Sequence, residues 1–230
     1  PYQFRENMTT LANSIKFEVN RPGARVIKCR ANGVEERPLI IIAEEYDNRT
    51  PPPANGPGIF NVTDFGVTGS GVETAKIQNA LDACSSSPGG GIVYFGPGVF
   101  TTGALIVNSK TMIYLAPGCL LQGSLNILDY PNFAGRKQLL AFNYANNSGI
   151  FGKGVVEGKG DILRGPNNIH LINTYGGSNL RFEDVVLRNS AGWNTQLLGT
   201  DGVIANNIKI VNDWAVANSD GMNPDCASNV

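Results

Sequence analysis

The chain has 230 residues, with 18 Lys and Arg against 19 Asp and Glu, and a formal net charge of −1. This balance excludes the strong positive charge by which proteins bind nucleic acids or anionic membranes, so we expect neither partner. Charged residues make up 16% of the chain and Gly contributes 28 residues, which favours short strands and tight turns over a helical bundle.

The first 50 residues predict a small antiparallel β unit. Their segments alternate between apolar and polar residues, as half-buried strands do, and are separated by typical turn sequences. The expected strands are SIKFEVN (14–20), ARVIKCR (24–30) and RPLIIIAEE (37–45), and the expected turns begin at Arg21 and Ala31.

A Pro- and Gly-rich segment follows at 51–58. Proline fixes the backbone angle φ and removes a hydrogen-bond donor, so this composition predicts a stiff linker. We therefore expect one domain over residues 1–50 and a second over residues 59–230. No apolar run is long enough to span a membrane. The N-terminus lacks the pattern of a signal peptide, so we expect that the mature chain begins after processing or that the sequence starts late.

Residues 72–84 predict an amphipathic helix, because Ile77, Ala80, Leu81 and Cys84 recur at helical spacing. After it come short apolar segments separated by Gly, Pro and Ser, which predict strands. These segments are GIVYF (91–95), ALIVN (104–108) and TMIYLAPGCLLQG (111–123).

An internal repeat is the strongest structural signal. The segments 180–189 and 203–212 match at a constant offset of 23 residues, and the earlier segment 150–159 shows the same spacing, with Glu157 where the other copies have Leu187 and Ile210. The matched pairs are Leu180 and Val203, Phe182 and Ala205, Val185 and Ile208, Leu187 and Ile210, and Asn189 and Asn212.

Repeats of this length indicate a solenoid in which each copy stacks on the next. Because these copies consist of strands, the sequence predicts an all-β fold, a parallel β-helix, with the helix at 72–84 covering its open first coil. An ordinary β-sandwich with fortuitous repeats is the alternative.

The candidate chemistry lies at the end of the chain, in ANSDGMNPDCASNV (217–230). Asn218 and Asp220 are two residues apart, so on a strand they would project from the same side, onto a groove along the solenoid. Asp225 follows Pro224 and is expected at a turn. Hydrolysis of a glycosidic bond usually takes two carboxyl groups, and the partner of Asp220 would come from the next coil.

At this point the sequence resembles glycoside hydrolase family 28, the polygalacturonases and their relatives. The resemblance covers about 59–230 and lies in four segments in the family's order: VTDFGVTGSGVETAKIQNALDACSSSPGGGIVYFGPGVFTTGALIV, GKGVVEGKG, LRNSAGWNTQL and NSDGMNPDCASNV. It implies a right-handed parallel β-helix and an inverting hydrolase without a metal or other cofactor.

By the same resemblance, Asp220 matches an Asp that helps to activate the attacking water, and Asn218 matches an Asn beside it in the cleft. The family's Asp-Asp pair, which includes the general acid, and its Gly-His-Gly and Arg-x-Lys segments would all follow Val230. The 230 residues alone are therefore expected to be inactive. Two residues depart from the family pattern: Glu157 and Asn223 both stand where Asp is usual.

Several other residues have two possible roles. Trp193 and Trp214 can stack on sugar rings or simply pack, and we include both with Asp225 as candidate substrate contacts. His170, the only histidine, does not match the Gly-His-Gly segment and is expected to be structural or at the surface. The segment holds no basic residues recognised as binding a uronic acid.

Secretion is predicted from four possible N-glycosylation sites, at Asn7, Asn48, Asn61 and Asn146. The four cysteines, Cys29, Cys84, Cys119 and Cys226, fit no zinc motif and leave open either one or two disulfides or buried free thiols.

The first hypothesis is thus the N-terminal part of an extracellular polysaccharide hydrolase. A second is a glucan hydrolase of glycoside hydrolase family 49, the dextranases and isopullulanases, which also place a β-rich domain before a β-helix. A third, of another class, is a non-catalytic β-helix that binds carbohydrate or serves in surface assembly.

Overall fold

The computed structural model describes residues 8–11, 14–28, 30–31, 33–35, 38–164, 168–213 and 215–230. The chain forms two compact units, residues 1–50 and residues 51–230. None of the helices in these ranges is long and apolar enough to cross a membrane.

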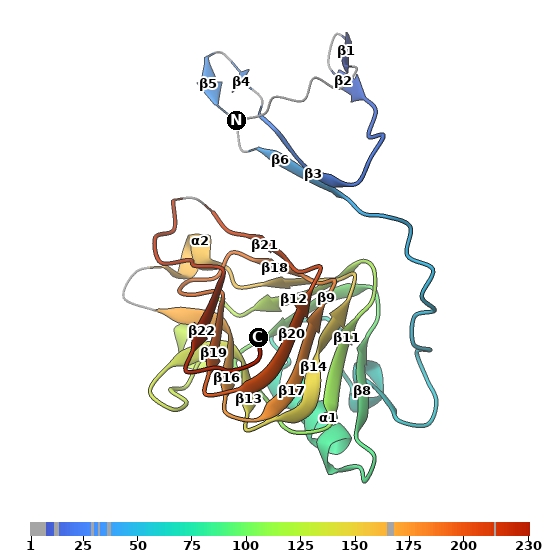
Figure 1. Cartoon of the computed structure of the whole chain (residues 1–230), viewed down its shortest axis with the longest axis vertical. Coiled ribbons are helices and arrows are strands. Elements are labelled where there is room, and N and C mark those ends of the chain that lie inside the picture. The colour runs from blue at the N-terminus through green and yellow to red at the C-terminus, as the bar shows by residue number, and fades with distance from the viewer. Residues whose placement is uncertain are drawn as a thin grey trace. The chain divides into compact units, whose positions relative to one another are not determined.

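The first unit consists of short antiparallel pairs (Figure 1). Within it, Arg49 forms an ion pair with Asp47 at 2.7 Å. The pairs are β1 (Met8–Leu11) with β2 (Ser14–Phe17), β3 (Gly23–Ile27) with β6 (Leu39–Ala43), and β4 (Arg30–Ala31) with β5 (Val34–Glu35).

The second unit is a right-handed parallel β-helix, as expected, with three parallel sheets running along it (Figure 1). The first sheet contains β7 (Ile59–Asn61), β8 (Gly91–Phe95), β11 (Thr111–Leu115), β14 (Asn146–Gly152), β17 (Ser178–Glu183) and β20 (Asp201–Asn206). The second contains β9 (Gly98–Thr102), β12 (Cys119–Gly123), β15 (Val155–Glu157), β18 (Val186–Arg188) and β21 (Lys209–Val211). The third contains β10 (Leu105–Val107), β13 (Lys137–Asn143), β16 (Ile169–Tyr175), β19 (Thr195–Leu198) and β22 (Met222–Asp225).

Helix α1 (Thr74–Ser86) covers the first coil, and the four apolar residues that predicted it are all buried. Because its apolar face packs on β7, β8 and β10, the helix closes one end of the hydrophobic core. The remaining helical elements are η1 (Val62–Phe65), η2 (Ile127–Asp129) and α2 (Gly160–Leu163).

The buried Glu73 fixes the chain just before α1. Its carboxylate accepts hydrogen bonds from the backbone N–H of Thr68 and of Gly69 and pairs with Lys76 at 2.9 Å. Burial alone would raise the pKa of Glu73, but the ammonium of Lys76 and these N–H donors outweigh it and lower the pKa to about 2.

The repeat register is confirmed for one pair of copies and wrong for the other. Leu180 pairs with Val203 and Leu187 with Ile210, at the predicted offset of 23. In the earlier copy, however, Val156 rather than Glu157 pairs with Leu187, and Glu157 lies beside Arg188, with which it forms an ion pair. Paired residues are 32 apart on the first sheet (Ile150 and Phe182) and 31 apart on the second (Val156 and Leu187), which an alignment without gaps cannot show.

The corner before the first sheet is a stack of residues in the left-handed conformation. The pairing of the strands places these residues on successive coils. A non-Gly residue at positive φ is uncommon in proteins unless it is Asn or Asp. The residues, with φ, are Gly90 (65°), Lys110 (61°), Asn147 (54°), Asn179 (56°), Gly202 (68°) and Asn229 (52°).

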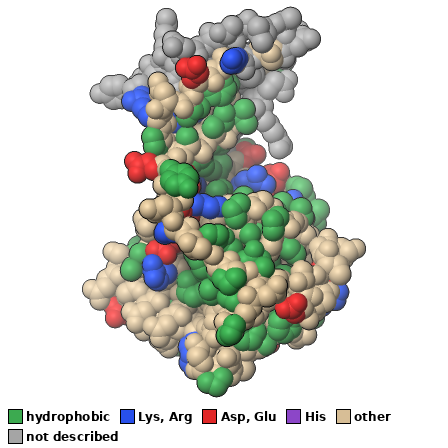
Figure 2. Space-filling view, turned by 90° about the vertical axis from the view of Figure 1, so that its right-hand side faces the viewer, with side chains coloured by type: hydrophobic (Ala, Val, Ile, Leu, Met, Phe, Trp, Pro, Cys, Tyr) green, Lys and Arg blue, Asp and Glu red, His purple; other side chains and the backbone are tan. Residues whose placement is uncertain are grey.

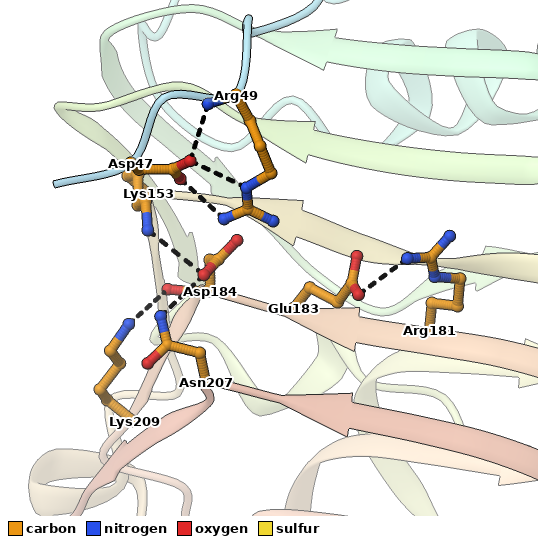
Figure 3. Close-up of polar contacts among 8 residues, drawn as sticks. All are labelled: Asp47, Arg49, Lys153, Arg181, Glu183, Asp184, Asn207 and Lys209. Atoms are coloured by element: carbon orange, nitrogen blue, oxygen red, sulfur yellow. Dashed lines mark hydrogen bonds and ion pairs between the residues drawn. The ribbon is translucent and has the colours of Figure 1, made fainter. Parts of the chain in front are cut away.

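The corner between the first and second sheets is held by charge (Figure 3). The buried carboxylate of Asp184 pairs with Lys153 at 3.2 Å and accepts a hydrogen bond from Asn207 at 2.7 Å, while Lys209 donates to the Asp184 backbone carbonyl. On the face of the 51–230 unit that Figure 2 shows, hydrophobic side chains gather near the middle.

Candidate functional site

The candidate site lies on the outer face of the third sheet. Ile172 and Leu197 point into the hydrophobic core, so their neighbours along each strand point outward. The register then aligns Asn173, Gln196 and Asn223 on the adjacent strands β16, β19 and β22 as one outward-facing polar row.

A buried polar network lies at the β16 end of this row. The amide nitrogen of Asn173 donates to Gln138 and to the hydroxyl of Tyr175, which itself donates to Gln138 at 2.9 Å. Because the amide nitrogen of Asn173 donates these two bonds, the atom that faces Nδ1 of His170 at 2.9 Å is the amide oxygen of Asn173. That oxygen can only accept, so Nδ1 of His170 carries the proton. All four residues are buried.

His170 is thus a structural residue of the site's floor, buried rather than at the surface. Burial lowers its pKa, the bond to Asn173 acts in the opposite direction, and the nearby charge of Arg136 lowers it further. The imidazole is therefore neutral near pH 7, and it supports the ring of Trp193 at a centroid distance of 5.4 Å.

Asp220 lies at the outer edge of the site, immediately before β22. Its backbone carbonyl accepts a hydrogen bond from Asn194 at 2.8 Å, which places it beside Trp193 on the neighbouring coil. Its carboxylate is exposed and has no hydrogen-bond partner among the described residues, so it is accessible to water and to a ligand.

The expectation that Asn218 and Asp220 alternate on a strand is wrong. The strand begins only at Met222, and Asn218 has a left-handed conformation, with φ of 55°, in the loop before it. That loop is tied to the sheet by Asn212, whose amide donates to the Ser219 carbonyl at 2.7 Å. Both Asn218 and Asp220 are nevertheless exposed.

Asp225 lies in β22 and not at a turn as expected. Its carboxylate accepts a hydrogen bond from Nε2 of Gln196 at 2.9 Å. The carboxylate of Asp225 is thus engaged by the sheet, whereas that of Asp220 is exposed.

The ring of Trp193 contacts a cationic side chain, Arg136, that sequence reasoning missed. The half-buried indole lies beneath the guanidinium of Arg136, whose Cζ is 5.8 Å from the ring centroid. Arg136 belongs to a tight turn in which its backbone exchanges two hydrogen bonds with Phe133, and the Phe133 ring packs on Tyr175. A basic residue thus does face this site, contrary to expectation.

Residue spacing could not have found Arg136 or Gln196, because each meets the rest of the site only across coils. Each of β16, β19 and β22 carries a single Asn or Gln, which gives no distinct signal in a chain rich in Asn. Trp214 and Asn7, two predicted functional residues, lie outside the described residues.

The other glycosylation candidates differ in how free their amides are. Asn48 is exposed, whereas Asn61 donates its amide to the Ala54 carbonyl and caps η1. Asn146 is exposed, but its amide oxygen accepts a hydrogen bond from Ser178 at 2.8 Å. Of the cysteines, Cys84 and Cys119 are buried free thiols and Cys226 is an exposed one, while Cys29 lies outside the described residues.

Comparison with known proteins gives the class that this fold and site define. Residues 59–123 match a family model described as rhamnogalacturonase A/epimerase, pectate lyase-like. Among solved structures, the chain is similar to a family 28 exopolygalacturonase of Yersinia enterocolitica (TM-score 0.64, 20% identity, 90% of this chain and 47% of that one). It is also similar to a polygalacturonase of Erwinia carotovora (TM-score 0.62, 22% identity, 77% and 54%). The chain thus has the pectin-lyase type of β-helix.

Curated relatives narrow the class. The chain is 34% identical over 123 residues to an exo-poly-α-D-galacturonosidase of Dickeya chrysanthemi, covering 45% of this chain and 20% of that protein. It is 28% identical over 191 residues to a polygalacturonase of Ralstonia solanacearum, covering 67% and 36%. The chain is thus similar to polygalacturonases over the part that these relatives match. The chain spans about 20–40% of the length of the curated relatives it matches.

Proposed function

We propose that this chain is part of a secreted, inverting hydrolase of an acidic polysaccharide of the polygalacturonate type. The observation that carries the proposal is the exposed carboxylate of Asp220, which has no partner among the described residues. The Asp220 backbone is bonded to Asn194, the residue after Trp193, whose ring lies beneath the cation of Arg136. The curated relatives, named for action on polygalacturonate, agree with that arrangement.

In the proposed mechanism, Asp220 accepts a proton from the attacking water on one face of the sugar. Trp193 offers an apolar ring to the sugar's C–H surface. The general acid, hydrogen-bonded to the leaving oxygen, protonates it, and its carboxyl group lies about 6.5–9.5 Å from that of Asp220, the separation that leaves room for the water. We place that acid on a further coil after Val230 in the full-length protein, so residues 1–230 alone would be inactive.

Arg136 favours an acidic sugar over the neutral glucan of the alternative hypothesis. A guanidinium held over an aromatic ring keeps its charge and can pair with a carboxylate in a bidentate manner. The Arg136 side chain has this position, and no described carboxylate pairs with it. A uronic acid carboxylate would fill that role, whereas dextran offers none.

The central test is Asp220→Asn in the full-length protein. We expect turnover of polygalacturonate to fall at least about a thousandfold with the fold intact, because the amide cannot accept the proton from water. Asp82→Asn, at an exposed position on α1, is the matched control and should keep wild-type turnover. Wild-type turnover by Asp220→Asn would refute the role given to this residue.

Three further measurements test the rest of the proposal. NMR of the first product should show the anomer opposite to that of the substrate, and retention would contradict an inverting mechanism. Cleavage of dextran in preference to polygalacturonate would support the glucan alternative, and binding of either without cleavage would support the non-catalytic one.

Secretion predicts a glycan at Asn48, the candidate whose amide no described residue engages. Mass spectrometry of protein from a eukaryotic secretory host would detect this glycan.

A further inference from the structure

Two buried polar atoms at the centre of the site have no hydrogen-bond partner among the residues that the structure describes. They are Oε1 of Gln196, on β19, and Nδ2 of Asn223, on β22. The two residues are directly opposite each other in the register, on the outward face of the third sheet. Gln196 is completely buried, so this is not a case of a solvated surface amide.

The orientation of the Gln196 amide is fixed by Asp225. A carboxylate can only accept hydrogen bonds, so the atom that faces Asp225 at 2.9 Å must be the donor Nε2. The other atom of the amide, Oε1, is then necessarily an acceptor. Leaving a buried donor or acceptor unpaired is destabilising, which makes such a pair of atoms unusual unless something binds there.

One acceptor beside one donor selects a particular kind of ligand group. A carboxylate would be repelled by Oε1 and by the charge of Asp225, and a metal cation would be repelled by the N–H of Asn223. A hydroxyl can donate to Oε1 and accept from Nδ2 through a single oxygen atom. Hydroxyls are also the groups that a polysaccharide carries on every ring.

We propose that Gln196 and Asn223 together hold one ring hydroxyl of the bound sugar, and that Asp225 is a positioning residue that orients Gln196. This inference rests on the proposed function, because it assumes a sugar over the third sheet. A site built to bind a hydroxyl rejects an analogue without it strongly, since its buried atoms then stay unpaired. The pair would therefore determine which sugars are accepted.

The test is a double-mutant cycle between protein and substrate in the full-length protein. The substrates are trigalacturonate and analogues that lack either the 2- or the 3-hydroxyl of one sugar ring. For the wild type, one of these deletions should lower kcat/KM at least tenfold. In the variants Gln196→Met and Asn223→Leu, the same hydroxyl deletion should lower kcat/KM less than threefold, because the side-chain groups that bind the hydroxyl are gone.

Two comparisons separate binding of the hydroxyl from a structural role. Asn206→Leu, at an exposed residue at the end of β20, should keep the full wild-type discrimination. Asp225→Asn should also keep it, since an amide oxygen can still accept from Gln196, whereas Asp225→Leu should lose it. Equal discrimination by the wild type, Gln196→Met and Asn223→Leu would overturn the proposal, as would a wild type indifferent to both hydroxyls.

A spectroscopic measurement on the unsubstituted protein covers the case in which a variant fails to fold. The side-chain amide signals of Gln196 and Asn223 should shift when trigalacturonate is added, and less with the critical deoxy analogue. If trigalacturonate is cleaved while these signals stay unmoved, the proposed function stands and this inference fails. If trigalacturonate is neither bound nor cleaved, the proposed function fails and the inference with it.

Discussion

Glu73 shows how one buried carboxylate can order the first coil. It anchors the 68–69 backbone and pairs with Lys76, and its pKa is lowered to about 2 although burial alone acts in the opposite direction. A group with a lowered pKa in the folded state stabilises the fold above its unfolded pKa, and this contribution is lost as the pH falls.

We therefore expect Glu73→Gln to be less stable than the wild type by about 1.5–3 kcal/mol at pH 7, the range for hydrogen bonds to charged groups. As the pH falls from above the ordinary pKa of 4.5 towards about 2, the wild type loses this advantage and the two unfolding free energies converge. Urea unfolding at a series of pH values measures this. Parallel pH profiles would contradict it, and Asp64→Asn, at an exposed position nearby, should give the wild-type profile.

Arg136 gives a second prediction for a single residue. Replacing it with Met keeps the side-chain packing on Trp193 but removes the charge that the proposed function assigns to a uronate carboxylate. KM for polygalacturonate should rise about tenfold, since a hydrogen bond to a charged group contributes about 1.5–3 kcal/mol. Steady-state kinetics with Arg181→Met as the control, a residue of the first sheet, would show whether the effect is local. An unchanged KM would remove Arg136 from substrate binding.

At the scale of the strand and its corner, the left-handed stack explains why the chain is rich in Asn and Gly. Each coil turns at this corner with one residue at positive φ, and side chains of successive coils also bond there, as Asn179 does to Asn147. Asn and Gly adopt this conformation at low cost.

Asn179→Ala should therefore lower the free energy of unfolding by about 1 kcal/mol, since alanine in the left-handed region is strained and the bond to Asn147 is lost. Asn179→Gly should cost less, because only the bond is lost. Chemical unfolding of the two variants decides the point. If glycine proved as costly as alanine, the backbone conformation would not be the cause.

The sequence located these elements well but aligned them less reliably. The sequence predicts β8 to the residue and β10 to within one residue at each end, because Gly, Pro and Ser bound them, but it joins β11 and β12 in one segment and misses β9. The predicted position of Glu157 in the repeat and the predicted strand at Asn218 are wrong because coil lengths change: Thr195 pairs with Met222, 27 residues on, instead of 23. Alternation within a strand is a local property, whereas register depends on the length of the preceding loop.

For the whole molecule, the hydrophobic core depends on the helix that closes its end. Leu81 is buried on the core-facing side of α1. Leu81→Ala should destabilise the β-helix by about 2–5 kcal/mol, through lost transfer energy and the cavity left behind. Asp82→Ala, at the adjacent exposed position, should change it little. Thermal and urea unfolding provide the comparison, and similar midpoints for the two variants would show that α1 contributes little to closing the core.

The β-helix itself could be predicted from the repeat, but the site could not be assembled in the same way. Asp220 and Trp193 were identified from local motifs, whereas Arg136, Gln196 and the buried His170 network meet only through coil stacking. A single sequence does not state which distant residues will lie side by side, so the floor of the site became visible only in three dimensions.

The changing coil length has a wider consequence. Along the first sheet, Tyr94, Tyr114, Phe151, Glu183 and Asn206 pair in succession, although the chain between neighbours runs to 20, 37, 32 and 23 residues. The excess emerges at the corners and leaves the spacing of the layers untouched. Such a scaffold allows evolution, or a protein engineer, to lengthen and reshape the loops at the corners one at a time while the stacked strands keep their spacing.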